Sequence, residues 1–169
     1  FAAAVETLRI ANRMLGYQAY EWRLASLDGQ KVMSSSGICL EVDTCLADER
    51  RYVSGENRVE MAIICSGIDV DQHINKSVNA WLRGAYNRGI AICSLCTAAH
   101  ILAQAGLLNG KRCAIHWENL PGFSEAFPQV EVYADLFEVD SNIYTCAGGT
   151  ASLDMMLSLI GQDFGENLV

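Results

Sequence analysis

GIAICSLCTAAHILAQAGLLNG, residues 89–110, joins a strand pattern directly to a helix pattern. Residues 90–95 form an apolar run typical of a buried strand, and a helix is expected over residues 97–107. Cys96 is left in the tight turn between them, which we call the Cys96 elbow. Such a turn holds its side chain above the carboxyl edge of a parallel sheet, where α/β folds bind their ligands. The sequence therefore predicts an α/β domain organised around Cys96.

Helix and strand patterns alternate along the rest of the chain, which is typical of a mostly parallel sheet flanked by helices on both faces. Residues 59–65 are expected to form a buried central strand, and residues 31–40 a short strand or hairpin arm containing Ser34, Ser35, Ser36 and Gly37. The other expected strands are residues 20–27, 113–117, 130–133, 136–139 and 143–146. The other expected helices are residues 6–15, 70–88, 118–127 (interrupted at Pro121 and Gly122) and 151–160.

Length and composition favour a single packed domain. The chain has 169 residues, of which 51% are hydrophobic and 19% charged. No apolar run is long enough for a membrane helix, and the first residues do not resemble a signal peptide. The net charge of −8 argues against direct binding of a phosphate backbone by this segment. The odd count of seven cysteines is more typical of a reduced, cytoplasmic protein than of a disulfide framework.

The Cys96 elbow carries the candidate chemistry. Its sulfur is expected at a helix N-terminus, where the helix dipole and free N–H groups stabilise a thiolate. Ser94 and Ala98 are small enough for the close crossing of strand and helix, although glycine is usual there. The alternative is a cysteine that is simply buried.

Two other hypotheses use the same cysteines. Cys93 and Cys96 form a CxxC pair of the kind found in redox proteins, but strand alternation turns Cys93 away from the crevice. Together with Cys113 and His116 they also have a zinc-like spacing. Zinc ligands usually lie in short polar turns, whereas these residues fall in apolar strands, so we expect no metal site.

His116 is the candidate partner of Cys96 because it ends the strand that follows the elbow helix. Glu118 comes two residues later, the order that orients a base in a Cys–His–carboxylate triad. His100 lies one turn after Cys96 and could approach the sulfur, but a histidine packed within the helix layer is at least as good an interpretation. His73 is expected to be a solvated residue at a helix start.

Backbone N–H groups offer a place for an anion. Gly67 follows the expected central strand, and its N–H group can join that of Thr97 in an oxyanion or carboxylate cradle. Gly148 and Gly149 precede the last helix, and either a second anion site or a tight strand–helix turn is expected there.

Four segments together resemble the ThiJ/PfpI-type, amidotransferase-like domain. They are CTAA (96–99), LAQAGLLNG (102–110), AIHW (114–117) and TCAGGTASLDMML (145–157). More narrowly, they resemble the version fused to a C-terminal AraC-type helix-turn-helix in bacterial regulators. The pieces AGLLNG and HWEN look closest to regulators of arginine, glycine betaine and carnitine catabolism. The resemblance covers nearly the whole chain and implies a flavodoxin-like fold.

The resemblance also implies roles for individual residues. Cys96 would be the elbow cysteine, His116 its partner, and Gly67 with Thr97 the backbone cradle. Trp117 could stack on a cationic head group. Ala98 departs from the glycine that many relatives have at the elbow.

On this basis, residues 1–169 are expected to form one sensor domain of an AraC-family transcriptional regulator. Its first strand, with the acidic partner of Cys96, would precede Phe1, and the DNA-binding domain would follow Val169. The partners expected are a small-molecule effector such as an amino acid or quaternary amine, a second copy of the chain, and DNA through the other domain alone. We expect no membrane contact and no cofactor. The alternative is a cysteine-dependent hydrolase, amidase or glyoxalase-like enzyme that uses Cys96 and His116.

Overall fold

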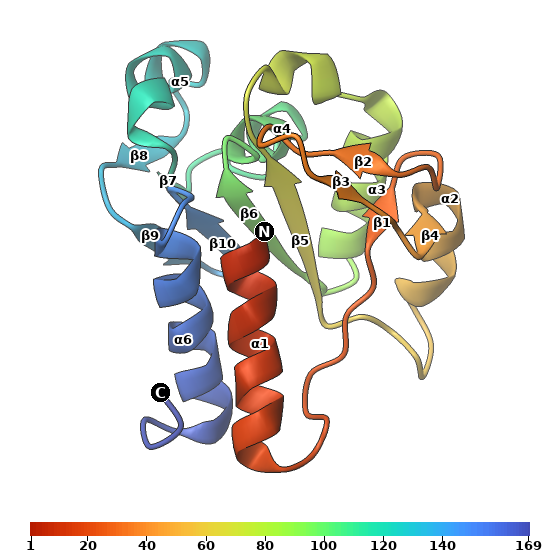
Figure 1. The fold of residues 1–169 in the computed structure, drawn as a ribbon. Helices are drawn as coiled ribbons and strands as arrows, with labels where there is room; N and C mark the ends of the chain where they lie inside the picture. Colours follow the sequence, from red (N-terminus) through yellow and green to blue (C-terminus); the bar gives the residue numbers. More distant parts are fainter.

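A four-stranded sheet forms the centre of the domain (Figure 1). The computed structural model describes residues 1–169, apart from the side chain of His73. The strands lie in the order β5 (Met61–Ser66), β6 (Ala91–Cys96), β10 (Ile143–Cys146) and β9 (Phe137–Asp140). The first three run parallel, and β9 pairs antiparallel with β10.

Three smaller sheets of two strands each surround this sheet. Two are parallel pairs: β1 (Ala25–Ser26) with β4 (Thr44–Cys45), and β7 (Arg112–Ala114) with β8 (Glu131–Tyr133). The third is the antiparallel hairpin of β2 (Val32–Met33) and β3 (Cys39–Leu40). The hairpin lies near the carboxyl end of β5 (Figure 1).

Helices cover both faces of the central sheet, as the sequence predicts. On one face, α1 (Ala2–Leu15) packs beside α6 (Ala151–Phe164), and both bury apolar residues against Cys93 and Leu95 of β6. On the other face, α3 (Lys76–Tyr86) and α4 (Ala99–Gln104) pack on Ile92 of the same strand. The shorter helical segments are α2 (Leu46–Glu49), η1 (Arg50–Tyr52), η2 (Val70–His73), η3 (Trp117–Asn119) and α5 (Leu120–Ala126). None of the helices among the described residues is both long and apolar enough to cross a membrane.

Three of the expected strands differ clearly in the structure. The strand expected over residues 113–117 is the shorter β7, so His116 lies beyond its end, at the start of η3. The strand expected over residues 20–27 is reduced to β1, partly because the amide side chain of Asn12 hydrogen-bonds to the backbone of Tyr20. The strand expected at residues 59–65 is present as β5, but it lies at the edge of the sheet and Cys65 is exposed. No strand among the described residues pairs with its outer edge, so the expectation of a buried central strand is wrong for these residues.

All five expected helices also have different bounds. The first begins at Ala2 and the last continues to Phe164, so these two are longer than expected. The helix expected over residues 70–88 is divided into η2 and α3, because the Asn75 side chain accepts a hydrogen bond from Ser77 N and caps a new helix. The elbow helix ends at Gln104 rather than at residue 107, before Gly106 with its φ of 76°. Pro121 does not interrupt α5; it lies in the first turn, where its missing N–H group has no helical partner to lose.

Candidate ligand-binding site at the Cys96 elbow

The elbow is built as the sequence predicts. Cys96 is the last residue of β6, and its φ of 62° places a non-glycine residue in the left-handed region. The chain then turns at once: Ala98 N donates to Leu95 O at 3.3 Å, and α4 begins at Ala99. An outlier of this kind persists only where the surrounding structure holds it in place.

Gly148 is a main part of that support. It lies between β10 and α6 with a φ of 91°. A Cβ atom on Gly148 would lie 2.7 Å from Cys96 Cβ and 3.0 Å from both Cys96 Cα and Cys96 Sγ. Residues 147–150 are therefore the tight strand–helix turn that the sequence offered as one alternative, and this turn packs directly on the elbow.

Burial, rather than the helix, dominates the electrostatics of the sulfur. Cys96 is half-buried, and desolvation raises the pKa of its thiol above the ordinary value. The Thr97 N–H group opposes this by hydrogen-bonding to the sulfur, whereas the charge of Glu118 raises the pKa further. The structure thus favours the neutral thiol at pH 7, and the expectation of a stabilised thiolate is wrong.

Gly67 and Thr97 meet beside the elbow. Ser66 pairs with Cys96 in the β5–β6 register, so Gly67 follows at the same edge of the sheet. The Thr97 hydroxyl donates to Gly67 O at 2.6 Å. The two residues are therefore neighbours, as expected, and an anion cradle made by their N–H groups remains a prediction.

His116 and Glu118 lie as a weakly associated pair. His116 Nδ1 is 3.7 Å from Glu118 Oε2, and the two side chains are 30% and 64% exposed. Among the described residues no hydrogen bond joins Cys96 to His116, so a catalytic dyad is not formed in this structure. Trp117 is 72% exposed, with its ring centroid 5.9 Å from that of His116. Trp117 thus offers an exposed aromatic face, and Glu118 offers an exposed carboxylate.

The family follows from comparison with known proteins. The model of the DJ-1/PfpI family matches residues 3–162. The chain belongs to the DJ-1/PfpI family. The solved structure of Drosophila melanogaster DJ-1beta has a TM-score of 0.78 at 21% identity, covering 99% of this chain and 84% of that one, and the fold predicted from sequence is confirmed.

Similar proteins include transcription regulators. The chain is 37% identical over 167 residues to the HTH-type transcriptional regulator GbdR of Pseudomonas aeruginosa, covering 99% of this chain and 44% of that one. It is 36% identical over 168 residues to the regulator CdhR of the same species, covering 99% and 48%. An AraC family transcriptional regulator from Pseudomonas putida has a TM-score of 0.80 at 25% identity, covering 99% of this chain and 86% of that one. The chain thus spans about half the length of the curated relatives it matches.

Cys93, Cys113 and His100 of this DJ-1/PfpI domain do not join the elbow. Cys93 and Cys96 are both free thiols, and Cys93 Sγ contacts Met155 Sδ at 3.9 Å in the core beneath α6. Cys113 Sγ hydrogen-bonds to Ala114 O at 3.4 Å. His100 packs edge-on against Phe123, with ring centroids 4.9 Å apart, and burial lowers its pKa. The described residues contain no group of His, Cys, Asp and Glu side chains able to hold a metal ion. The solvated position expected of His73 concerns a side chain outside the described part of the structure.

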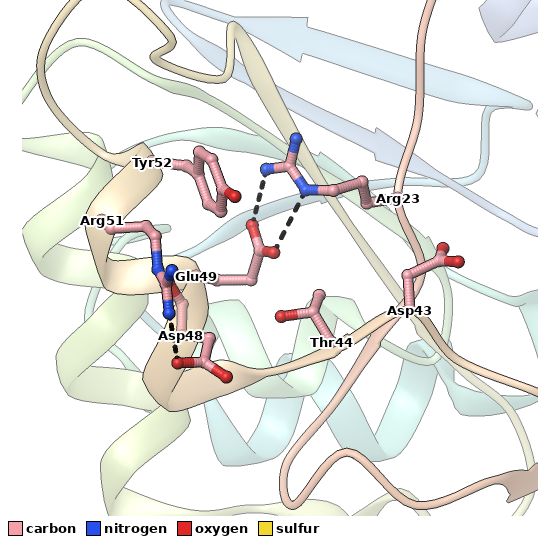
Figure 2. Close-up of a pocket in the computed structure, with 7 residues that line it drawn as sticks. All are labelled: Arg23, Asp43, Thr44, Asp48, Glu49, Arg51 and Tyr52. Carbon is pink, nitrogen blue, oxygen red and sulfur yellow. Dashed lines mark hydrogen bonds and ion pairs between the residues drawn. The ribbon is translucent and has the colours of Figure 1, made fainter.

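A polar cavity of about 200 Å³ lies beside the β1–β4 pair of this DJ-1/PfpI domain (Figure 2). Arg23 forms a two-pronged ion pair with the buried Glu49, at 2.9 Å, and its guanidinium carbon lies 3.9 Å above the ring of Tyr52. Arg51 pairs with Asp48 at 2.6 Å on the rim. Because its charged groups already pair with one another, we interpret the cavity as the inside of a clamp that holds residues 20–24 against α2 and η1.

Sequence reasoning missed two features of the site, namely the contact of Gly148 with the elbow and the Arg23–Glu49 clamp. The two adjacent glycines after a buried strand were a usable signal for the first, since only glycine tolerates both a positive φ and a close approach. The clamp has no local signal, because its two charges are 26 positions apart in the chain.

Proposed function

We propose that this chain is the effector-sensing and dimerisation domain of a bacterial AraC-family transcriptional regulator. The observation that carries the proposal is the match over 99% of this chain to HTH-type transcriptional regulators, of which it covers less than half. Residues 1–169 would form one sensor domain, and a helix-turn-helix domain outside this chain would contact DNA. The net charge of −8 supports this division, because a phosphate backbone repels an acidic surface.

The ligand site we propose is the crevice around Cys96, Thr97, Gly67, His116 and Trp117. Binding rather than catalysis is supported by the raised pKa of the Cys96 thiol, which leaves little thiolate at neutral pH. It is also supported by the half-buried imidazole of His116, which is only weakly paired with Glu118.

The ligand class we propose is a small amino acid or quaternary amine. The exposed ring of Trp117 offers a face for a cation, and Glu118 adds a negative charge close to Cys96. Binding would change the relative stability of two arrangements of a homodimer and so move the DNA-binding domains. We propose that the whole protein acts in the cytoplasm and needs no cofactor.

Thermal-shift titration of the full-length protein with arginine, glycine betaine, carnitine and related amines tests this proposal. A ligand present at one hundred times its Kd stabilises the folded state by about 2.7 kcal/mol. For a domain of this size that corresponds to a rise in melting temperature of roughly 5–10 °C. If no compound of this class raises the melting temperature, the proposed ligand class is wrong.

One observation favours a second candidate, a cysteine-dependent hydrolase, amidase or glyoxalase-like enzyme. The left-handed backbone of Cys96 presents its sulfur at the carboxyl edge of the sheet, as a nucleophile would be presented. Turnover of amide, ester or glyoxal substrates that is abolished in Cys96→Ala would establish that function. Saturable ligand binding by the wild type, without turnover of any of these substrates, would support the sensor.

A further inference from the structure

The tip of the β2–β3 hairpin lies close to Gly67. The tip comprises residues 34–38 and contains three consecutive serines. Ser35 Oγ lies 3.6 Å from the position that a Cβ atom on Gly67 would occupy, and no other heavy atom beyond the neighbouring residues lies within 4 Å of that position. A hydroxyl from a distant part of the sequence therefore reaches the backbone beside the Cys96 elbow.

The tip is held so that only one of its three hydroxyls is free. Ser34 N donates to Ile38 O at 2.8 Å, and Ile38 N donates back to Ser34 Oγ at 3.1 Å. The hydroxyls of Ser34 and Ser36 bond to each other at 2.8 Å. Ser35 Oγ takes part in none of the hydrogen bonds among the described residues. A firmly closed turn thus presents the unused Ser35 hydroxyl toward Gly67.

Gly67 is itself fixed to the elbow. The Thr97 hydroxyl donates to its carbonyl at 2.6 Å, and Thr97 is 5% exposed. Ser35, Gly67, Thr97 and Cys96 therefore lie in succession from the hairpin tip to the elbow. The free hydroxyl of Ser35 is therefore close to Gly67, one of the residues of the ligand site that we propose.

The two ends of the proposed ligand site differ in charge. The hairpin lies near the end of β5, whereas β7 and α5, between which Trp117 and Glu118 lie, are on the opposite side of β6 (Figure 1). The second end offers an aromatic ring and a carboxylate, which suit a cation. The first end offers an uncharged hydroxyl donor over backbone, which suits an anionic oxygen.

From this arrangement we infer that Ser35 determines ligand specificity by donating a hydrogen bond to a carboxylate. The ligand is then a zwitterion, whose cationic group lies at Trp117 and whose carboxylate lies at Ser35 and Gly67. This inference rests on the proposed function, because it assigns the two ends of the ligand in the same crevice. It adds the requirement that a carboxylate be present.

Two pairs of compounds differ in the carboxylate and retain the cation: glycine betaine with choline, and L-arginine with agmatine. Their Kd values would be measured by isothermal titration calorimetry on the full-length wild type, on Ser35→Ala and on Ser36→Ala. Ser36 is the matched control, because its hydroxyl lies in the same tip but hydrogen-bonds to Ser34.

We expect the zwitterion of at least one pair to bind more tightly than its carboxylate-free partner. Since a hydrogen bond to a charged group is removed, Ser35→Ala should weaken the zwitterion about tenfold or more. The same change should alter the partner amine less than about twofold, and Ser36→Ala should leave both within about threefold.

The outcomes separate the inference from the proposed function. If the wild type binds a zwitterion and Ser35→Ala binds it equally well, the role of Ser35 is wrong while the sensor function stands. Equal affinity of the wild type for a zwitterion and its carboxylate-free partner also overturns the inference alone. If the wild type binds none of the four compounds, the proposed ligand class fails, and the inference fails with it.

Discussion

Replacing Gly148 by alanine should destabilise the domain by about 2–5 kcal/mol, since two penalties add. The φ of 91° at this position costs an L-residue about 1–2 kcal/mol. The new Cβ atom would also lie 2.7 Å from Cys96 Cβ and 3.0 Å from Cys96 Cα. Neither of these atoms can move without shifting the elbow backbone. We therefore expect overpacking to lower the free energy of unfolding by about a further 1–3 kcal/mol.

Gly149→Ala is the matched control. Gly149 also has a positive φ, 58°, but no atom beyond its chain neighbours lies within 4 Å of its missing Cβ. Its alanine variant should therefore lose only about 1–2 kcal/mol from backbone strain. Urea denaturation followed by tryptophan fluorescence gives the free energy of unfolding of both variants. If the two values agree within about 0.5 kcal/mol, Gly148 does not support the elbow in the way the structure indicates.

Three further changes test separate contacts. Arg23→Ala should lower the free energy of unfolding in urea by about 2–3 kcal/mol, because the buried carboxylate of Glu49 is left unpaired; the 34% exposure of Arg23 keeps this below the value for a fully buried pair. Thr97→Val should lower it by about 1–2 kcal/mol, because Gly67 O loses its hydroxyl donor. The rate of Cys96 alkylation by iodoacetamide should still rise as the pH passes 9, because burial raises the pKa of this thiol and the thiolate is the reactive form.

Each of these changes has a control in the chain. Arg51→Ala removes an exposed ion pair with Asp48 and should cost less than about 1 kcal/mol; a loss as large as that of Arg23→Ala would mean that burial of Glu49 is unimportant. Thr97→Ser keeps the hydroxyl and should recover most of the stability. Exposed Cys39 is the reference for alkylation, and a Cys96 rate that is fast and level between pH 6 and 8 would contradict the raised pKa.

The elbow was predictable because its signal is local. An apolar run followed at once by a helical pattern leaves only Cys96 for the turn, and the structure places the turn there. The division of the helix at Asn75 was less predictable, because a side-chain cap competes with an apolar periodicity that continues across it. The edge position of β5 depends on which strands pair, and that pairing is not written in the strand's own residues.

The position of Gly67 beside Thr97 was predictable, whereas the protonation state of Cys96 was not. Gly67 and Thr97 were expected together because parallel strands end at one edge, and they are in contact. The expectation of a thiolate at Cys96 was wrong, because the pKa of the thiol depends on how deeply tertiary packing buries the sulfur. The contacts of Gly148 with Cys96 and of Ser35 with Gly67 join residues far apart in the chain, so no local pattern contains them.

The most direct test of the Cys96 crevice as the ligand site is protection of Cys96 from alkylation. The full-length protein would be treated with iodoacetamide, with and without a compound that raises its melting temperature, and each cysteine followed by peptide mass spectrometry. At one hundred times the Kd about 1% of the sites remain free. We therefore predict that the ligand slows alkylation of Cys96 by at least about tenfold. Half-buried Cys45, in β4, should react at the same rate as before. A compound that raises the melting temperature and leaves the Cys96 rate unchanged would place the ligand elsewhere and contradict the account.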